Sequence, residues 1–158
     1  MFDNYKKVAP KIISVLWGLW GLYFVVIGFA LVGVTYWSDK SFIAEAIDSV
    51  VGVEFSGRQL DIITLVLFDA GYNFIWAGAV AFISSFFIWK RNIYAMFLAT
   101  LVGCFIELPI FLPSPAEIEY TRTVGTIIPT LGAWIAIILS IHFIYSDKQN
   151  SKKVLTEV

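Results

Sequence analysis

The sequence predicts an all-α integral membrane protein, a bundle of four transmembrane helices with both termini in the cytoplasm. Hydrophobic residues make up 59% of the 158 positions and charged residues only 15%, with a mean hydropathy of +0.81. A soluble domain averages about 45–50% apolar and about 25% charged residues. The apolar residues fall in four long blocks, and basic residues gather on one side of those blocks, as membrane topology requires.

The four blocks are expected to be membrane spans of a single domain, residues 1–158. The first, about 12–37, contains no charged residue and is longer than the core of about 7–15 residues in a cleaved signal peptide. The remaining spans are expected at about 60–89, 93–112 and 123–145. At about 1.5 Å per residue, each block is long enough to cross about 30 Å of hydrocarbon. The polar tail, 147–158, is expected to be flexible.

Positive charge determines the predicted orientation. One side carries eight basic residues: Lys6, Lys7, Lys11, Lys90, Arg91, Lys148, Lys152 and Lys153. The opposite side carries only Lys40, Arg58 and Arg122. Because cytoplasmic loops carry an excess of Lys and Arg, the first side is assigned to the cytoplasm, which gives an N-in, C-in topology.

The first outer connection is expected to contain a short amphipathic helix. Its apolar residues follow a helical period: Phe42, Ile43, Ala46, Ile47, Val50 and Val51. A helix from about Ser41 to Val51 would be about 16 Å long, roughly half the hydrocarbon thickness. It is therefore expected to lie on the outer surface and not to span the membrane.

The chain carries few residues suited to catalysis or metal binding. Cys104 is the only cysteine and His142 the only histidine, so neither an internal disulfide nor a multi-His metal site can form within one chain. We find no nucleotide-binding, zinc-protease or nucleophile-elbow motif. The sequence therefore predicts no catalytic residue, no metal and no cofactor, which argues against an enzyme. A net charge of −1 gives no reason to expect nucleic acid as a partner.

Four polar residues are expected to converge near the outer mouth of the bundle: Asp69, Asn73, Glu107 and Arg122. The second span repeats polar and small residues at every fourth position, which places them on one face that we expect to point inward: Asp69, Asn73, Ala77, Ala81 and Ser85. A matching row on the third span is Thr100, Gly103, Cys104 and Glu107. Ionisable groups at membrane depth are costly and mark functional sites by default. The structural alternative is that Arg122 pairs with Glu107 or Asp69 and holds the spans together.

An aromatic group in the first span, Trp17, Trp20, Tyr23 and Phe24, allows two interpretations. It lies too deep to be only an interfacial belt. These side chains either line a flat hydrophobic ligand or pack against neighbouring helices and lipid.

The layout resembles the DoxX-like group of small four-helix bacterial and archaeal membrane proteins. The resemblance rests on a glycine-rich first span (Gly18, Gly21, Gly28), a long outer loop and the tight basic turn Trp89-Lys90-Arg91-Asn92. It includes no specific motif, so no functional residue is carried over. It implies an association with quinone-linked or thiol-linked redox complexes and a location in the prokaryotic cytoplasmic membrane.

Three functions remain open. Small size and the lack of catalytic groups favour a non-catalytic accessory or stabilising subunit of a larger membrane complex. A binder of a small lipid-soluble molecule, such as a quinone or lipid, would hold the head group at the outer polar cluster. A small transporter or channel would use Asp69 and Glu107 for a proton or cation. That last function requires a homo-oligomer, because four helices can hardly enclose a transport path. The expected partners are the lipid bilayer and either other membrane subunits or further copies of the chain.

Overall fold

The computed structural model describes residues 2–51, 57–107 and 124–156, and these residues form five helices and no strands. The helices are α1 (Phe2–Trp37), α2 (Lys40–Val51), α3 (Gly57–Trp89), α4 (Ile93–Glu107) and α5 (Val124–Thr156). Within the described ranges, three segments are long and apolar enough to cross a membrane: Lys7–Trp37, Gly57–Trp89 and Pro129–Ser146. The predicted all-helical membrane class is confirmed at this level. Of the expected third span, 93–112, the described part is α4.

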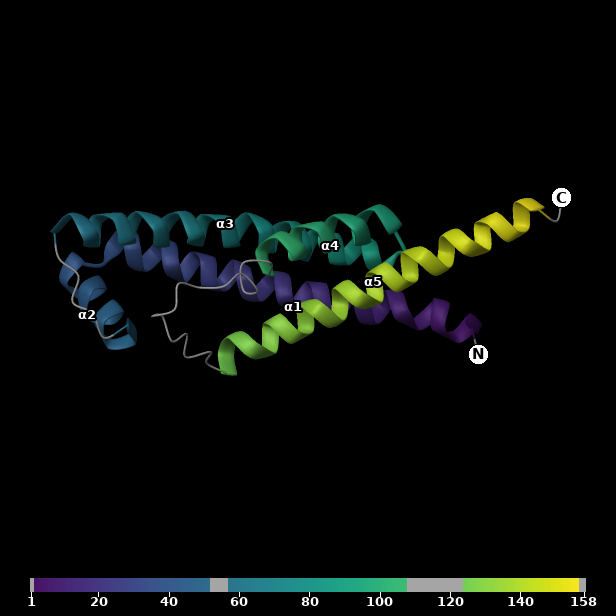
Figure 1. The fold of residues 1–158 in the computed structure, drawn as a ribbon, viewed down its shortest axis with the longest axis horizontal. Coiled ribbons are helices and arrows are strands. Elements are labelled where there is room, and N and C mark those ends of the chain that lie inside the picture. The colour runs from purple at the N-terminus through teal and green to yellow at the C-terminus, as the bar shows by residue number, and fades with distance from the viewer. Residues whose placement is uncertain (1, 52–56, 108–123, 157–158) are drawn as a thin grey trace.

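Helices α1 and α3 run antiparallel and are in backbone contact (Figure 1). A Cβ atom built on Gly21 would lie 2.6 Å from the carbonyl oxygen of Gly78. A Cβ atom built on Gly28 would lie 2.6 Å from the carbonyl oxygen of Gly71. Only glycine allows so close an approach, since any side chain at these positions would meet the backbone of the opposite helix.

The contact between α1 and α3 repeats every seven residues. Seven residues before Gly21 on α1 and seven residues after Gly78 on α3, the Ser14 hydroxyl donates a hydrogen bond of 2.7 Å to the carbonyl oxygen of Ser85. A strict seven-residue repeat keeps the same seam in contact when two helices wind around each other with a left-handed supercoil. The small residues therefore fix both the register and the crossing of this helix pair.

Helices α4 and α5 pack around the indole ring of Trp17 on α1, and α4 also packs against α3. This ring is 0% exposed, and it covers Gly103 of α4, where an added Cβ would lie 2.3 Å from the ring atom Cη2. Its Nε1 atom donates a hydrogen bond of 3.3 Å to Ser140 of α5. Whereas α3 runs alongside α1, α5 crosses it obliquely (Figure 1). The core around Trp17 thus joins three helices through side chains.

Helices α3 and α4 form an antiparallel hairpin (Figure 1). The turn between them places Arg91 at a φ of 64°. The side chain of Asn92 caps α4, because its Oδ1 atom accepts a hydrogen bond of 3.1 Å from the backbone N–H of Ala95. At the same end of the molecule, Lys11 lies 5.5 Å from the centroid of the Trp89 ring, a cation–π distance. The N-terminal part of α1 and the basic turn therefore lie together.

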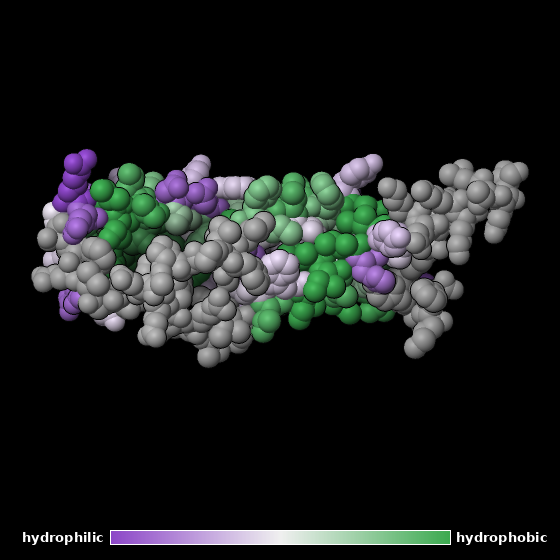
Figure 2. Space-filling view, viewed as in Figure 1, coloured by the Kyte–Doolittle hydropathy of each residue, from purple (hydrophilic) through white to green (hydrophobic). Residues whose placement is uncertain are grey.

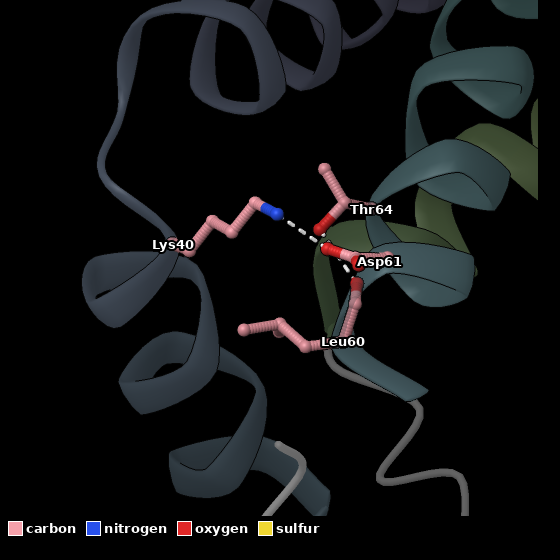
Figure 3. A network of polar contacts seen from close by, with 4 residues as sticks. All are labelled: Lys40, Leu60, Asp61 and Thr64. Carbon is pink, nitrogen blue, oxygen red and sulfur yellow. Dashed lines mark hydrogen bonds and ion pairs between the residues drawn. The ribbon is translucent and has the colours of Figure 1, made fainter. Parts of the chain in front are cut away.

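The helix expected in the first outer connection is present as α2. Ile43 is its buried anchor, and Lys40 forms an exposed ion pair with Asp61 at the start of α3. Figure 3 shows this pair beside Thr64, whose hydroxyl donates to the carbonyl oxygen of Leu60. Elsewhere the visible surface is dominated by hydrophobic side chains across its central part (Figure 2), as expected for helices in contact with lipid.

Candidate functional site

Glu107, at the last described turn of α4, has a carboxyl group that is completely buried. Its exposed fraction is 0%. One oxygen, Oε1, accepts a hydrogen bond of 2.9 Å from the indole Nε1 of Trp20 on α1. The other oxygen, Oε2, has no hydrogen-bond partner among the described residues. A buried carboxyl group is normally satisfied at both oxygens, whereas the described residues satisfy only one oxygen of Glu107.

Aromatic rings surround the donor of this hydrogen bond. The Trp20 ring meets Trp17 edge to face, with centroids 5.5 Å apart, and meets Phe24 at 4.4 Å. Phe24 in turn contacts Phe74 of α3 at 4.9 Å. The aromatic group expected in the first span therefore points into the bundle, and Trp17 and Trp20 belong to its core. Glu107 lies at the edge of a mainly aromatic environment.

The expected row on the third span lies on the inner face of α4. Thr100, Gly103 and Glu107 are buried, and Cys104 is half-buried. The Thr100 hydroxyl oxygen is a second buried atom without a hydrogen-bond partner in the described part of the chain. Thr100 and Glu107 are seven residues apart, about 10 Å along the helix. The face of α4 that meets α1 thus carries two unsatisfied polar groups, with the Trp17–Gly103 contact between them.

Asp69 and Asn73 lie elsewhere, on a partly exposed side of α3. The Asn73 Nδ2 atom donates a hydrogen bond of 3.2 Å to Asp69 Oδ2. The Trp76 indole donates one of 3.0 Å to Asn73 Oδ1. We call Asp69, Asn73 and Trp76 the α3 polar row. Among the described residues, no hydrogen bond or ion pair links this row to Glu107. Arg122, the fourth residue of the expected cluster, lies outside the described residues.

The exposed position of Asp69 differs from the inward position expected for it, and helix geometry gives the reason. Residues four apart advance by about 40° around the axis beyond a full turn, so a row of every fourth residue rotates by about 160° between Asp69 and Ser85. Ala77, Ala81 and Ser85 are buried as expected, but Asp69 has rotated away from the contact with α1. The row of α3 that contacts α1 consists of residues seven apart, Gly71, Gly78 and Ser85. Residues with this spacing shift by only about 20° around the helix axis per step.

The described residues contain no group of three or more His, Cys, Asp or Glu side chains close enough to hold a metal ion. What the arrangement around Glu107 offers chemically is one acidic group, one donor already committed to it, and apolar rings. These groups are suited to holding a polar head group on a hydrophobic molecule.

No protein-family model, curated protein or solved structure matches the chain. The resemblance of the layout to the DoxX-like group is not supported by any family match.

Proposed function

We propose that this protein binds a small lipid-soluble molecule inside its helix bundle and that Glu107 holds the polar head group of that molecule. The observation that carries this proposal is the buried carboxyl group of Glu107, with one oxygen bonded to Trp20 and the other without a partner among the described residues. An ionisable group at membrane depth is costly to keep, and it marks a functional site by default.

The surroundings of Glu107 suit the hydrophobic part of such a molecule. Ligand sites are mostly apolar and aromatic, with a few convergent polar groups that fix the orientation of the ligand. Trp20 is 3% exposed and its neighbour Phe24 is packed against the core. A head group that donates a hydrogen bond would complete the partners of Oε2. Lipids and quinols with a hydroxyl group, and molecules with an amine, all meet this requirement.

A co-purification experiment tests the proposal. The wild-type protein and the Glu107→Gln and Trp20→Phe variants are extracted in a mild detergent, and the bound small molecules are identified by mass spectrometry. The Asp69→Asn variant is the matched control, because it removes a carboxylate from the exposed side of α3. We expect a molecule that is present at a fixed ratio with the wild type and the control and is depleted in the other two. Equal recovery from all four proteins would refute the assignment to Glu107.

We also propose that the chain crosses the membrane four times, with both termini in the cytoplasm. The start of α1, the end of α5 and the α3–α4 turn lie toward the same end of the molecule (Figure 1), and these segments carry the basic residues that favour the cytoplasm. The 15 residues of α4 account for about 22 Å of the required 30 Å. Single cysteines at positions 90 and 45, in a Cys104→Ala background, test this topology. An impermeant maleimide should label position 45 in intact cells and position 90 only after lysis, and the reverse pattern would contradict it.

A second candidate function, an accessory subunit of a larger membrane complex, is supported by the α3 polar row. Asp69 and Asn73 lie among exposed apolar side chains, including Leu65 and Tyr72. A polar group on an otherwise apolar helix surface in the membrane favours contact with another polypeptide, because lipid offers it no hydrogen bond. Photo-crosslinking from position 72 in intact membranes tests this idea. A crosslink to one defined protein, lost in Asp69→Ala, would support a subunit role, and crosslinks to lipid alone would exclude this surface.

A further inference from the structure

The class of ligand follows from the charge of the site, if the proposed function is correct. We infer that the site at Glu107 selects a hydrophobic organic cation, a molecule in which an ammonium group is attached to an aromatic or aliphatic body. The inference rests on three features of the described residues: the buried carboxyl oxygen without a hydrogen-bond partner, the absence of a cationic partner for it among these residues, and the aromatic rings around its partner Trp20.

The first two features concern the hydrogen-bond and ion-pair partners of Glu107. Trp20 satisfies Oε1 with a neutral N–H group, which supplies a hydrogen bond but no positive charge. Among the described residues, the ion pair between Lys40 and Asp61 lies at the far end of α3, and Glu107 takes part in none. Buried charges in proteins are paired, because an isolated carboxylate in an apolar interior is very costly. A ligand ammonium group would donate a hydrogen bond to Oε2 and neutralise the carboxylate at the same time.

The third feature is the aromatic surrounding. One connected series of ring contacts is formed by Trp17, Trp20, Phe24 and Phe74, and Trp20 joins this series to the carboxyl group. Aromatic faces attract ammonium groups through their quadrupole, most strongly where water is excluded. A carboxylate together with several aromatic rings is therefore a combination that recognises organic cations. A neutral alcohol can provide the hydrogen bond but cannot form an ion pair with the carboxyl group.

A matched pair of probes separates charge from hydrogen bonding. 4-Phenylbutylamine and 4-phenylbutan-1-ol share the same body, and both carry a donor, but only the amine is positively charged near neutral pH. Binding of each to the full-length protein in phosphatidylcholine nanodiscs is measured by isothermal titration calorimetry, with empty nanodiscs as the blank. We expect the wild type to prefer the amine by at least about tenfold, since a charge-assisted hydrogen bond is worth more than a neutral one.

The variants assign this preference to the site. Glu107→Gln should lose the preference for the amine, whereas Glu45→Gln, at an exposed position of α2, should retain it. Trp20→Phe keeps the carboxyl group and should still prefer the amine. Glu107→Leu removes the carboxyl group and should also lose the preference, so it serves as a second variant if Glu107→Gln fails to fold. Equal binding of amine and alcohol by the wild type would overturn the cation inference while leaving the proposed binding function intact. Retention of the amine preference in Glu107→Gln would also overturn it. Absence of binding by both probes, together with no co-purifying molecule, would refute the proposed function itself.

Discussion

Replacing Gly21 by alanine should separate α1 from α3. An added Cβ atom would lie 2.6 Å from the carbonyl oxygen of Gly78 and 2.6 Å from the backbone nitrogen of Phe82. An ordinary contact for a Cβ atom begins at 3.4 Å, so the two helices would have to move apart by about 0.8 Å at this point. Both opposing atoms belong to the backbone and cannot rotate away. The strain must therefore be distributed along the whole helix pair.

The expected loss of stability is about 1–3 kcal/mol, the usual cost of inserting a methyl group into a well-packed interface. Gly132→Ala in α5 is the matched control, because an added Cβ there meets nothing within 4 Å, and alanine favours a helix by up to about 1 kcal/mol over glycine. Thermal unfolding of both variants in the same detergent, followed by circular dichroism, measures the difference. If Gly21→Ala unfolds at the same temperature as Gly132→Ala or above it, the backbone contact between α1 and α3 does not exist as described.

Two further substitutions probe the other side of α1. Trp20→Phe removes the only hydrogen bond that the described residues donate to the Glu107 carboxyl group. It should destabilise the fold by about 1–3 kcal/mol, the cost of an unsatisfied buried acceptor. Trp37→Phe, at a site that is 80% exposed, should unfold like the wild type, and equal effects of the two would contradict the role of the hydrogen bond. Gly103→Ala should displace the ring of Trp17, which lies 2.3 Å from the added Cβ. A lower unfolding temperature together with altered near-ultraviolet circular dichroism is expected, and an unchanged spectrum would exclude the displacement.

Helix positions could be predicted from the sequence because they depend on local properties of the chain. The length of each apolar block sets the number of long helices, and the period of apolar residues around Ile43 predicts α2. The burial of Glu107 was also predictable from its place on the small-residue row of α4. These features need no knowledge of how one helix lies against another.

The pairing of helices was harder to predict, because it depends on rotation about each helix axis. The seven-residue rows that join α1 and α3 were present in the sequence, with Gly21 and Gly28 on one helix and Gly71 and Gly78 on the other. A search for residues four apart selected a different row on α3 and assigned Asp69 to the interior. The observed contact shows that a seven-residue spacing was the informative signal for this antiparallel pair.

The contact between Trp20 and Glu107 could not be predicted from depth alone. Counted by helix rise from the expected inner ends of their spans, Trp20 lies about 12 Å and Glu107 about 21 Å into the membrane. Their side-chain atoms are nevertheless 2.9 Å apart. Counting by rise treats the helices as parallel to one another and perpendicular to the bilayer, whereas the helices are inclined to one another (Figure 1). Long side chains extend across the remaining distance.

The two faces of α1 make different contacts, and this difference restricts where a ligand can enter. Toward α3, the backbones of the two helices are in contact at Gly21 and Gly28. A ligand could therefore enter between α1 and α3 only if these two helices separated. Toward α4 and α5, the helices are held apart by the rings of Trp17 and Trp20. The buried oxygens of Thr100 and Glu107 that have no hydrogen-bond partner among the described residues lie on this side. Side chains can change rotamer, whereas a close backbone contact can only separate. We therefore expect the proposed ligand of Glu107 to enter on this side of α1 and not between α1 and α3.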